Sequence, residues 1–128
     1  MKDGAQTNPA TLVPAEMDTF ARRTVSSLEI YRDTVGAVEG VGDVDKLVRY
    51  AEVATALIVY FLEIHPFANG NGHTARFLLL ALFARQNIFP TNAWPIHPRP
   101  ADPPYSDLIK RYRRGDRDPL VEFVLAAL

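Results

Sequence analysis

The 128-residue chain contains no cysteine, which excludes disulfide bonds, thiolate metal sites and thiol nucleophiles. It has no excess of either charge, because 14 Lys and Arg residues face 15 Asp and Glu residues, for a net charge of -1. This balance gives no electrostatic reason to expect nucleic acid or an anionic membrane as a partner. No signal-peptide pattern follows Met1, and residues 51–64 form too short an apolar run to span a membrane. We therefore expect a globular protein in the cytoplasm, or in a host cell if the chain is part of a secreted effector.

Hydrophobic residues recur at helical spacing along most of the chain, whereas no segment alternates as a strand would. The predicted helices lie at about 15–35, 43–64, 73–87, 105–114 and 118–128. Asn87 is predicted to end the third helix in a left-handed conformation, and a proline-rich connection, 91–104, follows it. The fold class is therefore all-α, a bundle of about five or six helices in one domain.

One twelve-residue segment collects most of the chemically capable side chains, and it reads His65-Pro66-Phe67-Ala68-Asn69-Gly70-Asn71-Gly72-His73-Thr74-Ala75-Arg76. Pro66 predicts that the preceding helix ends at His65. The glycines at 70 and 72 predict a tight turn, after which a buried helix begins near His73. Backbone N–H groups and the positive end of the dipole at a helix N-terminus favour an anion, so the turn is typical of a phosphate-binding loop.

The side chains around this turn indicate phosphoryl or nucleotidyl transfer. His73 and Arg76 are three residues apart and share a helix face, where Arg76 can bind a phosphate with two parallel hydrogen bonds. His65 is suited to accept a proton near neutral pH. Each residue also has a structural explanation: His65 as a helix-end group, the asparagines as turn residues and Arg76 as a surface charge.

The segment resembles the signature of the Fic family, His-Pro-Phe-x-(Asp or Glu)-Gly-Asn-Gly-Arg-x-x-Arg. Seven specified positions match, whereas Asn69 replaces the carboxylate and His73 replaces the first arginine. The resemblance extends over roughly residues 14–128, because the segment 115–123 is similar to the C-terminal helix of the family. Family members usually transfer AMP from ATP to a hydroxyl side chain of a target protein, and some transfer phosphate, UMP or phosphocholine instead.

The resemblance implies a role for each matching residue. His65 would be the catalytic base. The nucleotide and its phosphates would be bound by Asn69, Gly70, Asn71, Gly72, His73, Arg76 and Tyr105. Asn69 would also contact the Mg²⁺ or Mn²⁺ ion that accompanies ATP, weakly because its amide oxygen carries no charge. Tyr105 would lie near the adenine, although its place in an apolar helical stripe explains it equally well.

The resemblance also implies partners and leaves an alternative function open. Residues 1–13 are expected to be a flexible segment or the end of a β-hairpin flap that holds the target, with a Fic-like core domain over 14–128. No inhibitory glutamate motif appears within the 128 residues, so an inhibitory helix, if one exists, would lie in a separate antitoxin-like chain or in sequence outside them. Because Asn69 and His73 remove charge that would support a triphosphate, two alternatives stay open: a degenerate Fic fold that binds without catalysing, or a Fic enzyme that transfers a different phosphate-containing group.

Overall fold

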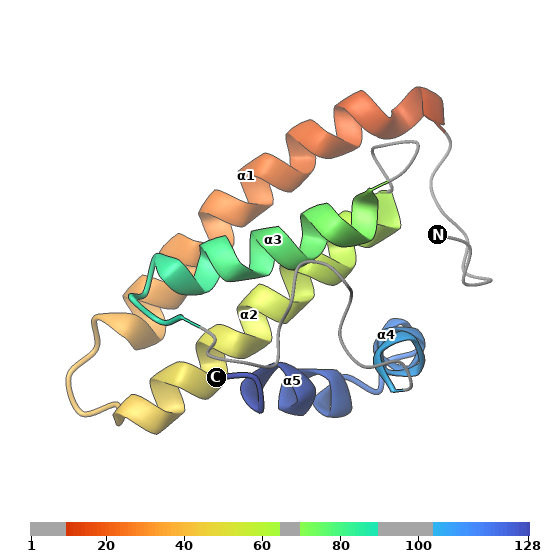
Figure 1. The fold of residues 1–128 in the computed structure, drawn as a ribbon. Helices are drawn as coiled ribbons and strands as arrows, with labels where there is room; N and C mark the ends of the chain where they lie inside the picture. The colour runs from red at the N-terminus through yellow and green to blue at the C-terminus, as the bar shows by residue number, and fades with distance from the viewer. Residues whose placement is uncertain (1–9, 65–69, 90–103) are drawn as a thin grey trace.

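The computed structural model describes residues 10–64, 70–89 and 104–128, and these residues form five α-helices and no strand (Figure 1). The helices are α1 (Val13–Tyr31), α2 (Asp43–Ile64), α3 (Asn71–Ala84), α4 (Tyr105–Arg113) and α5 (Asp118–Leu125). A 3₁₀ turn, Ala10–Leu12, precedes α1, and a π-helical turn, Arg32–Gly36, follows it. The predicted all-α bundle is thus confirmed.

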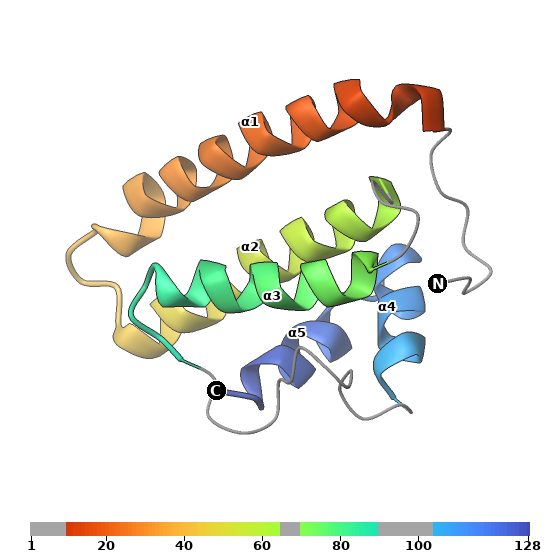
Figure 2. The same ribbon diagram turned by 45° about the horizontal axis from the view of Figure 1, so that its top comes forward.

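Helix α2 is the centre of the bundle. It packs against α1, α3 and α5, while α4 packs against α5 (Figures 1 and 2). Ten residues of α2 are buried: Tyr50, Ala51, Ala54, Thr55, Leu57, Ile58, Val59, Phe61, Leu62 and Ile64. Burial of this face removes a large apolar area from water, which is the main favourable term in folding. The hydrophobic segment that leads into the glycine turn is therefore the core element of the fold.

Tyr50 joins the three long helices near one end of the bundle. Its ring is 1% exposed and meets the rings of Tyr31 on α1 and Phe83 on α3 edge-on, with centroid distances of 5.0 and 5.5 Å. Its hydroxyl donates a hydrogen bond to the carbonyl oxygen of Leu82. That carbonyl lies in the last turn of α3, where helix carbonyls lack intrahelical partners. The side chain therefore packs the core and caps α3 at once.

Left-handed residues end two helices as the sequence predicts. Asn87 has φ 58°, and the N–H of Ile88 donates to the carbonyl of Phe83 at 3.0 Å, which closes the end of α3. Gly115 has φ 98° after α4, and the N–H of Asp116 donates to the carbonyl of Arg111 at 3.0 Å. Both ends follow the capping pattern in which a residue with positive φ lets the next N–H reach back over the last turn.

Several helix boundaries differ from the prediction. Helix α1 ends at Tyr31 rather than at 35, α3 ends at Ala84 rather than at 87, and α5 ends at Leu125 rather than at 128. Helix α3 begins at Asn71, two residues before the predicted start, because Gly70 alone makes the left-handed turn. Ala10–Leu12 are helical and Val13 begins α1, so the described part of the N-terminal segment does not form the end of a β-hairpin flap. Residues 1–9 and most of the proline-rich connection lie outside the described residues.

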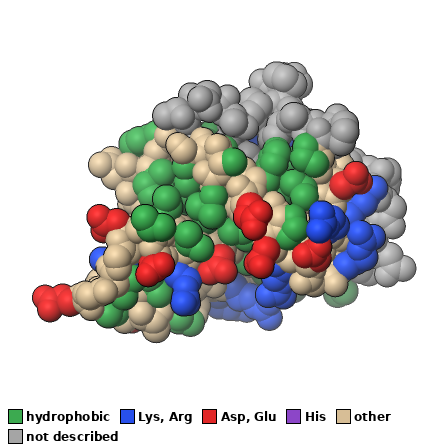
Figure 3. Space-filling model, turned by 90° about the horizontal axis from the view of Figure 1, so that it is seen from below, with side chains coloured by type: hydrophobic (Ala, Val, Ile, Leu, Met, Phe, Trp, Pro, Cys, Tyr) green, Lys and Arg blue, Asp and Glu red, His purple; other side chains and the backbone are tan. Residues whose placement is uncertain are grey.

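Helix length and surface composition can be described for the residues that the structure covers. None of the described helices combines the length and the apolar character that crossing a membrane requires. Figure 3 shows one face of the molecule, on which hydrophobic, acidic and basic side chains are all present. This mixture agrees with the near-zero net charge of the chain.

We predict that Tyr50→Phe lowers the free energy of unfolding by about 1–2 kcal/mol, because the buried carbonyl of Leu82 loses its hydrogen-bond donor while the ring still packs. Urea denaturation followed by circular dichroism measures this change. Tyr60→Phe is the matched control, since Tyr60 lies on the same helix and is partly buried. Equal stability losses in the two variants would contradict the role of the Tyr50 hydroxyl.

Comparing the wild-type protein with Tyr50→Phe also tests how the contribution of Tyr50 to stability depends on pH. Burial raises the pKa of Tyr50 above its ordinary value of 10.0, and the nearby Arg85 opposes that rise in pKa. A raised folded-state pKa means that the stabilisation from the phenol is complete below pH 10 and is lost as pH rises through the folded pKa. The stability difference between the wild-type protein and Tyr50→Phe should therefore be constant from pH 7 to about pH 9 and decrease above pH 10. A difference that grew above pH 10 would contradict the assignment.

Candidate functional site

The site is built at the junction of α2 and α3. The last turn of α2 is buried, with Phe61, Leu62 and Ile64 each no more than 4% exposed, and this burial fixes the point at which the chain leaves α2. His65 and Asn69 follow directly but lie outside the described residues, so their roles stay predictions. The described part of the site begins at Gly70.

Gly70 turns the chain into α3 with a left-handed backbone, φ 81° and ψ 8°. L-residues with a Cβ atom disfavour this conformation, which explains why glycine occupies the position. The N–H of Thr74 donates to the Gly70 carbonyl at 2.9 Å and begins the helix. Gly70 provides no capping side chain, and the first turn of α3 contains no acidic residue. The positive end of the α3 dipole therefore meets no carboxylate from its own first turn, which favours an external anion.

Asn71 and Arg76 are buried polar residues at this end of α3, at 3% and 7% exposure. Arg76 lies back along the first turn: its Nη1 atom is 3.1 Å from the place that a Cβ atom at Gly72 would occupy. Gly72 thus leaves room for the guanidinium, which a larger residue would push away. Turn, helix N-terminus and guanidinium come together within seven residues, and the arrangement can bind a phosphate.

The other two predicted nucleotide contacts lie in different surroundings. His73 is exposed in the first turn of α3. Tyr105 begins α4 and is 3% exposed, and its ring packs against Phe123 of α5 with the centroids 6.1 Å apart. The structure therefore bears out the apolar stripe that the sequence indicates for Tyr105, while a contact with adenine stays a prediction.

The described residues fit a phosphate better than a metal ion. No group of three or more His, Cys, Asp or Glu side chains in the described parts of the chain is arranged to hold a metal. Carboxylates are the usual protein ligands of Mg²⁺, and α3 begins without one. A divalent ion at this site would depend on the phosphates of its nucleotide and on Asn69.

Sequence reasoning identified Gly72 and Arg76 but not the relation between them. Both residues were assigned to phosphate binding separately, whereas the structure shows that Nη1 of Arg76 lies only 3.1 Å from where a Cβ atom at Gly72 would stand. The spacing of four residues on one helix face could have indicated this contact.

The sequence of the chain matches the model of the Fic/DOC family over residues 8–83. The match spans more than half of the chain and contains the whole twelve-residue segment. No match was found among curated proteins or among solved structures.

We predict that Gly72→Ala separates helix stability from anion binding. Alanine replaces glycine inside α3, which should raise the free energy of unfolding by about 0.5–1 kcal/mol. The new Cβ displaces the Arg76 guanidinium, so the affinity for inorganic triphosphate should fall by about tenfold. Urea denaturation measures the first effect and isothermal titration calorimetry the second.

Gly42→Ala is the matched control, because a Cβ at Gly42 would meet nothing within 4 Å and the residue precedes α2 as Gly70 precedes α3. We expect it to leave triphosphate affinity unchanged. If Gly72→Ala bound triphosphate as tightly as the control, the placement of Arg76 by Gly72 would not matter for binding.

Proposed function

Because this chain belongs to the Fic/DOC family, we propose that it transfers AMP from ATP to a hydroxyl side chain of a target protein. The observation that supports the proposal is the buried Arg76 at the N-terminus of α3, placed beside Gly72 and behind the left-handed turn at Gly70. A buried cation at the positive end of a helix is electrostatically unfavourable. The negative charge of a bound polyphosphate would offset both the charge of Arg76 and the positive end of the α3 dipole.

The proposed reaction assigns one step to each part of the segment. His65 removes the proton from the target hydroxyl, whose oxygen then attacks the α-phosphorus of ATP. A bond forms between that oxygen and phosphorus, the bond from phosphorus to the β-phosphate oxygen breaks, and pyrophosphate leaves. The N–H groups at the start of α3 and the Arg76 guanidinium stabilise the charge on the phosphates as the reaction proceeds.

Magnesium or manganese would reach the site with ATP. It would neutralise phosphate charge, with Asn69 as the oxygen ligand that the segment offers. Since an amide replaces the carboxylate of the family motif, we propose that this protein depends on a higher concentration of the metal than family members with a carboxylate there.

The second candidate function is a binding or scaffold module that retains the fold without transfer. It is favoured by the exposed His73, which stands where the family motif has an arginine. A neutral imidazole does not provide the fixed fork of five donors that a guanidinium presents. The loss of a positive charge where ATP would bind should reduce the rate of AMP transfer more than it reduces the affinity for a protein partner.

We expect the purified protein to modify itself when incubated with ATP and Mg²⁺ or Mn²⁺, and intact-protein mass spectrometry to detect a gain of one adenylyl group. His65→Ala should reduce the rate by about a hundredfold or more, because it removes the general base. His97→Ala, a histidine outside the segment, should leave the rate unchanged. If the mass gain were that of a phosphate and still required His65, then His65 would remain the general base and the transferred group would be phosphate instead of AMP.

The double substitution Asn69→Asp with His73→Arg separates the two candidate functions. It restores the carboxylate and the guanidinium of the family motif. If the chain is a weakened transferase, the double variant should transfer AMP faster than the wild-type protein in the same assay. Transfer by the double variant with none by the wild-type protein would instead support the scaffold function. An unchanged rate would show that these two positions do not limit catalysis.

A further inference from the structure

A heptad-spaced stripe of charged residues runs along the outer face of α1. Asp18, Arg22, Val25, Glu29 and Arg32 follow one another at intervals of four, three, four and three residues, which places them on one side of the helix. Arg32, the first residue of the π-helical turn, continues the stripe beyond α1. We refer to these five residues as the α1 stripe.

The α1 stripe faces away from the rest of the protein. Within α1, Phe20 and Tyr31 are the buried residues, and both face α2. Figures 1 and 2 show α1 as the outermost layer of the described bundle. The side chains of Asp18, Arg22 and Arg32 are 63–68% exposed, and Val25, an apolar residue, is 59% exposed. The stripe is thus available to another molecule.

Two hollows border the α1 stripe. A shallow one of about 360 Å³ is lined by Ala21, Arg22, Val25, Ser26 and Glu29. A deeper one of about 460 Å³ lies between the C-terminal half of α1 and the end of α3, and Val25, Glu29 and Arg32 form part of its wall. A helix laid along the stripe could place side chains in both hollows.

The order of charges along the α1 stripe lets two copies pair in the antiparallel direction with opposite charges facing each other. From the N-terminal end it runs acidic, basic, apolar, acidic, basic, so the reversed order is basic, acidic, apolar, basic, acidic. When two copies are placed antiparallel with Val25 opposite Val25, Asp18 of each copy meets Arg32 of the other, and Arg22 meets Glu29. Every charged position then faces the opposite sign, and the two apolar positions meet at the centre.

We propose that the protein forms a symmetric homodimer in which the α1 stripes of two copies pack antiparallel. The contact is isologous, since each pairing occurs twice about a two-fold axis at Val25. A parallel arrangement in the same register would place like charges opposite each other, so the charge order also selects the direction. This assembly does not depend on the proposed enzymatic function.

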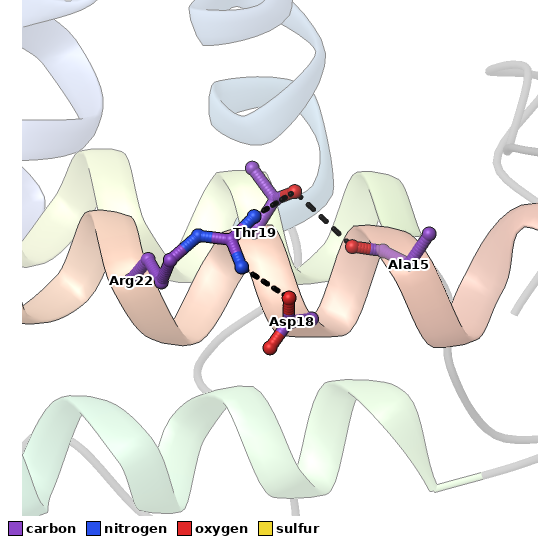
Figure 4. A network of polar contacts seen from close by, with 4 residues as sticks. All are labelled: Ala15, Asp18, Thr19 and Arg22. Atoms are coloured by element: carbon purple, nitrogen blue, oxygen red, sulfur yellow. Dashed lines mark hydrogen bonds and ion pairs between the residues drawn. The ribbon is translucent and has the colours of Figure 1, made fainter.

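The ion pairs already present on α1 are compatible with this contact. Arg22 donates a hydrogen bond to Asp18 one turn earlier and also reaches the Thr19 hydroxyl, which itself donates to the Ala15 carbonyl (Figure 4). Arg32 contacts Asp33. Each guanidinium has five donors and can keep its partner on its own helix while binding a second carboxylate. Since all these groups are exposed, the dimer should be weak and sensitive to salt.

Sedimentation velocity across a protein concentration series tests the proposal. The wild-type protein should shift from monomer to dimer with rising concentration at low ionic strength, and the shift should need more protein in high salt. Arg22→Glu and Glu29→Arg should each weaken dimerisation by about tenfold or more, because each places two like-charged pairs across the interface. Circular dichroism verifies that both variants remain helical.

Mixing the two variant proteins supplies the decisive measurement. In the mixed dimer the acidic side chain introduced at position 22 meets the basic one introduced at position 29, and the unchanged Glu29 and Arg22 meet each other. An equimolar mixture should therefore dimerise about as well as the wild-type protein although each variant alone stays monomeric. Arg49→Glu, an exposed charge reversal on α2 outside the stripe, should not affect dimerisation. A monomeric wild-type protein at every concentration, or a mixture no better than its components, would overturn the proposal.

Discussion

The antiparallel packing of α2 against α3 is the constraint on which the rest of the structure depends. The two helices pack against each other, and Ile58 of α2 and Leu79 and Phe83 of α3 are buried in the core. Tyr50 secures the far end of this pair through the Leu82 carbonyl, and the left-handed Gly70 lies at the near end. Because α2 and α3 are packed together, the core of the protein fixes Ile64, where α2 ends, and Asn71, where α3 begins.

At the near end, the structure places a buried guanidinium where backbone electrostatics oppose it. Arg76 lies in the second turn of a helix whose first turn carries no acidic side chain. Glycine at position 72 allows this placement, and glycine at position 70 allows the preceding turn. This local positive potential is the feature on which the proposed binding of a polyphosphate rests.

The helices were predictable from the sequence because their apolar periodicity and end signals agree. Asn87 adopts the left-handed conformation that its position indicates, and α5 begins at Asp118, the predicted start. The start of α3 was placed two residues late, since the residue pattern does not reveal how many glycines a turn uses. The burial of Arg76 and its approach to Gly72 were not predictable, because they depend on how α2 and α3 pack. Tyr105 is a second example, because its apolar helical spacing is equally compatible with a core residue and with a residue that contacts a ligand.

The unequal burial of the helices also determines which part of the molecule opens first. Helix α1 contributes two buried aromatic side chains and several partly buried ones to the core, whereas α2 contributes ten buried residues. Separation of α1 from α2 therefore needs less free energy than global unfolding, and it leaves the contacts of α2 with α3 and α5 intact. Brief detachment of α1 would expose the apolar face of the central helix and make the protein vulnerable to proteases there. Any association that covers α1 would lengthen the lifetime of the folded chain in the cell.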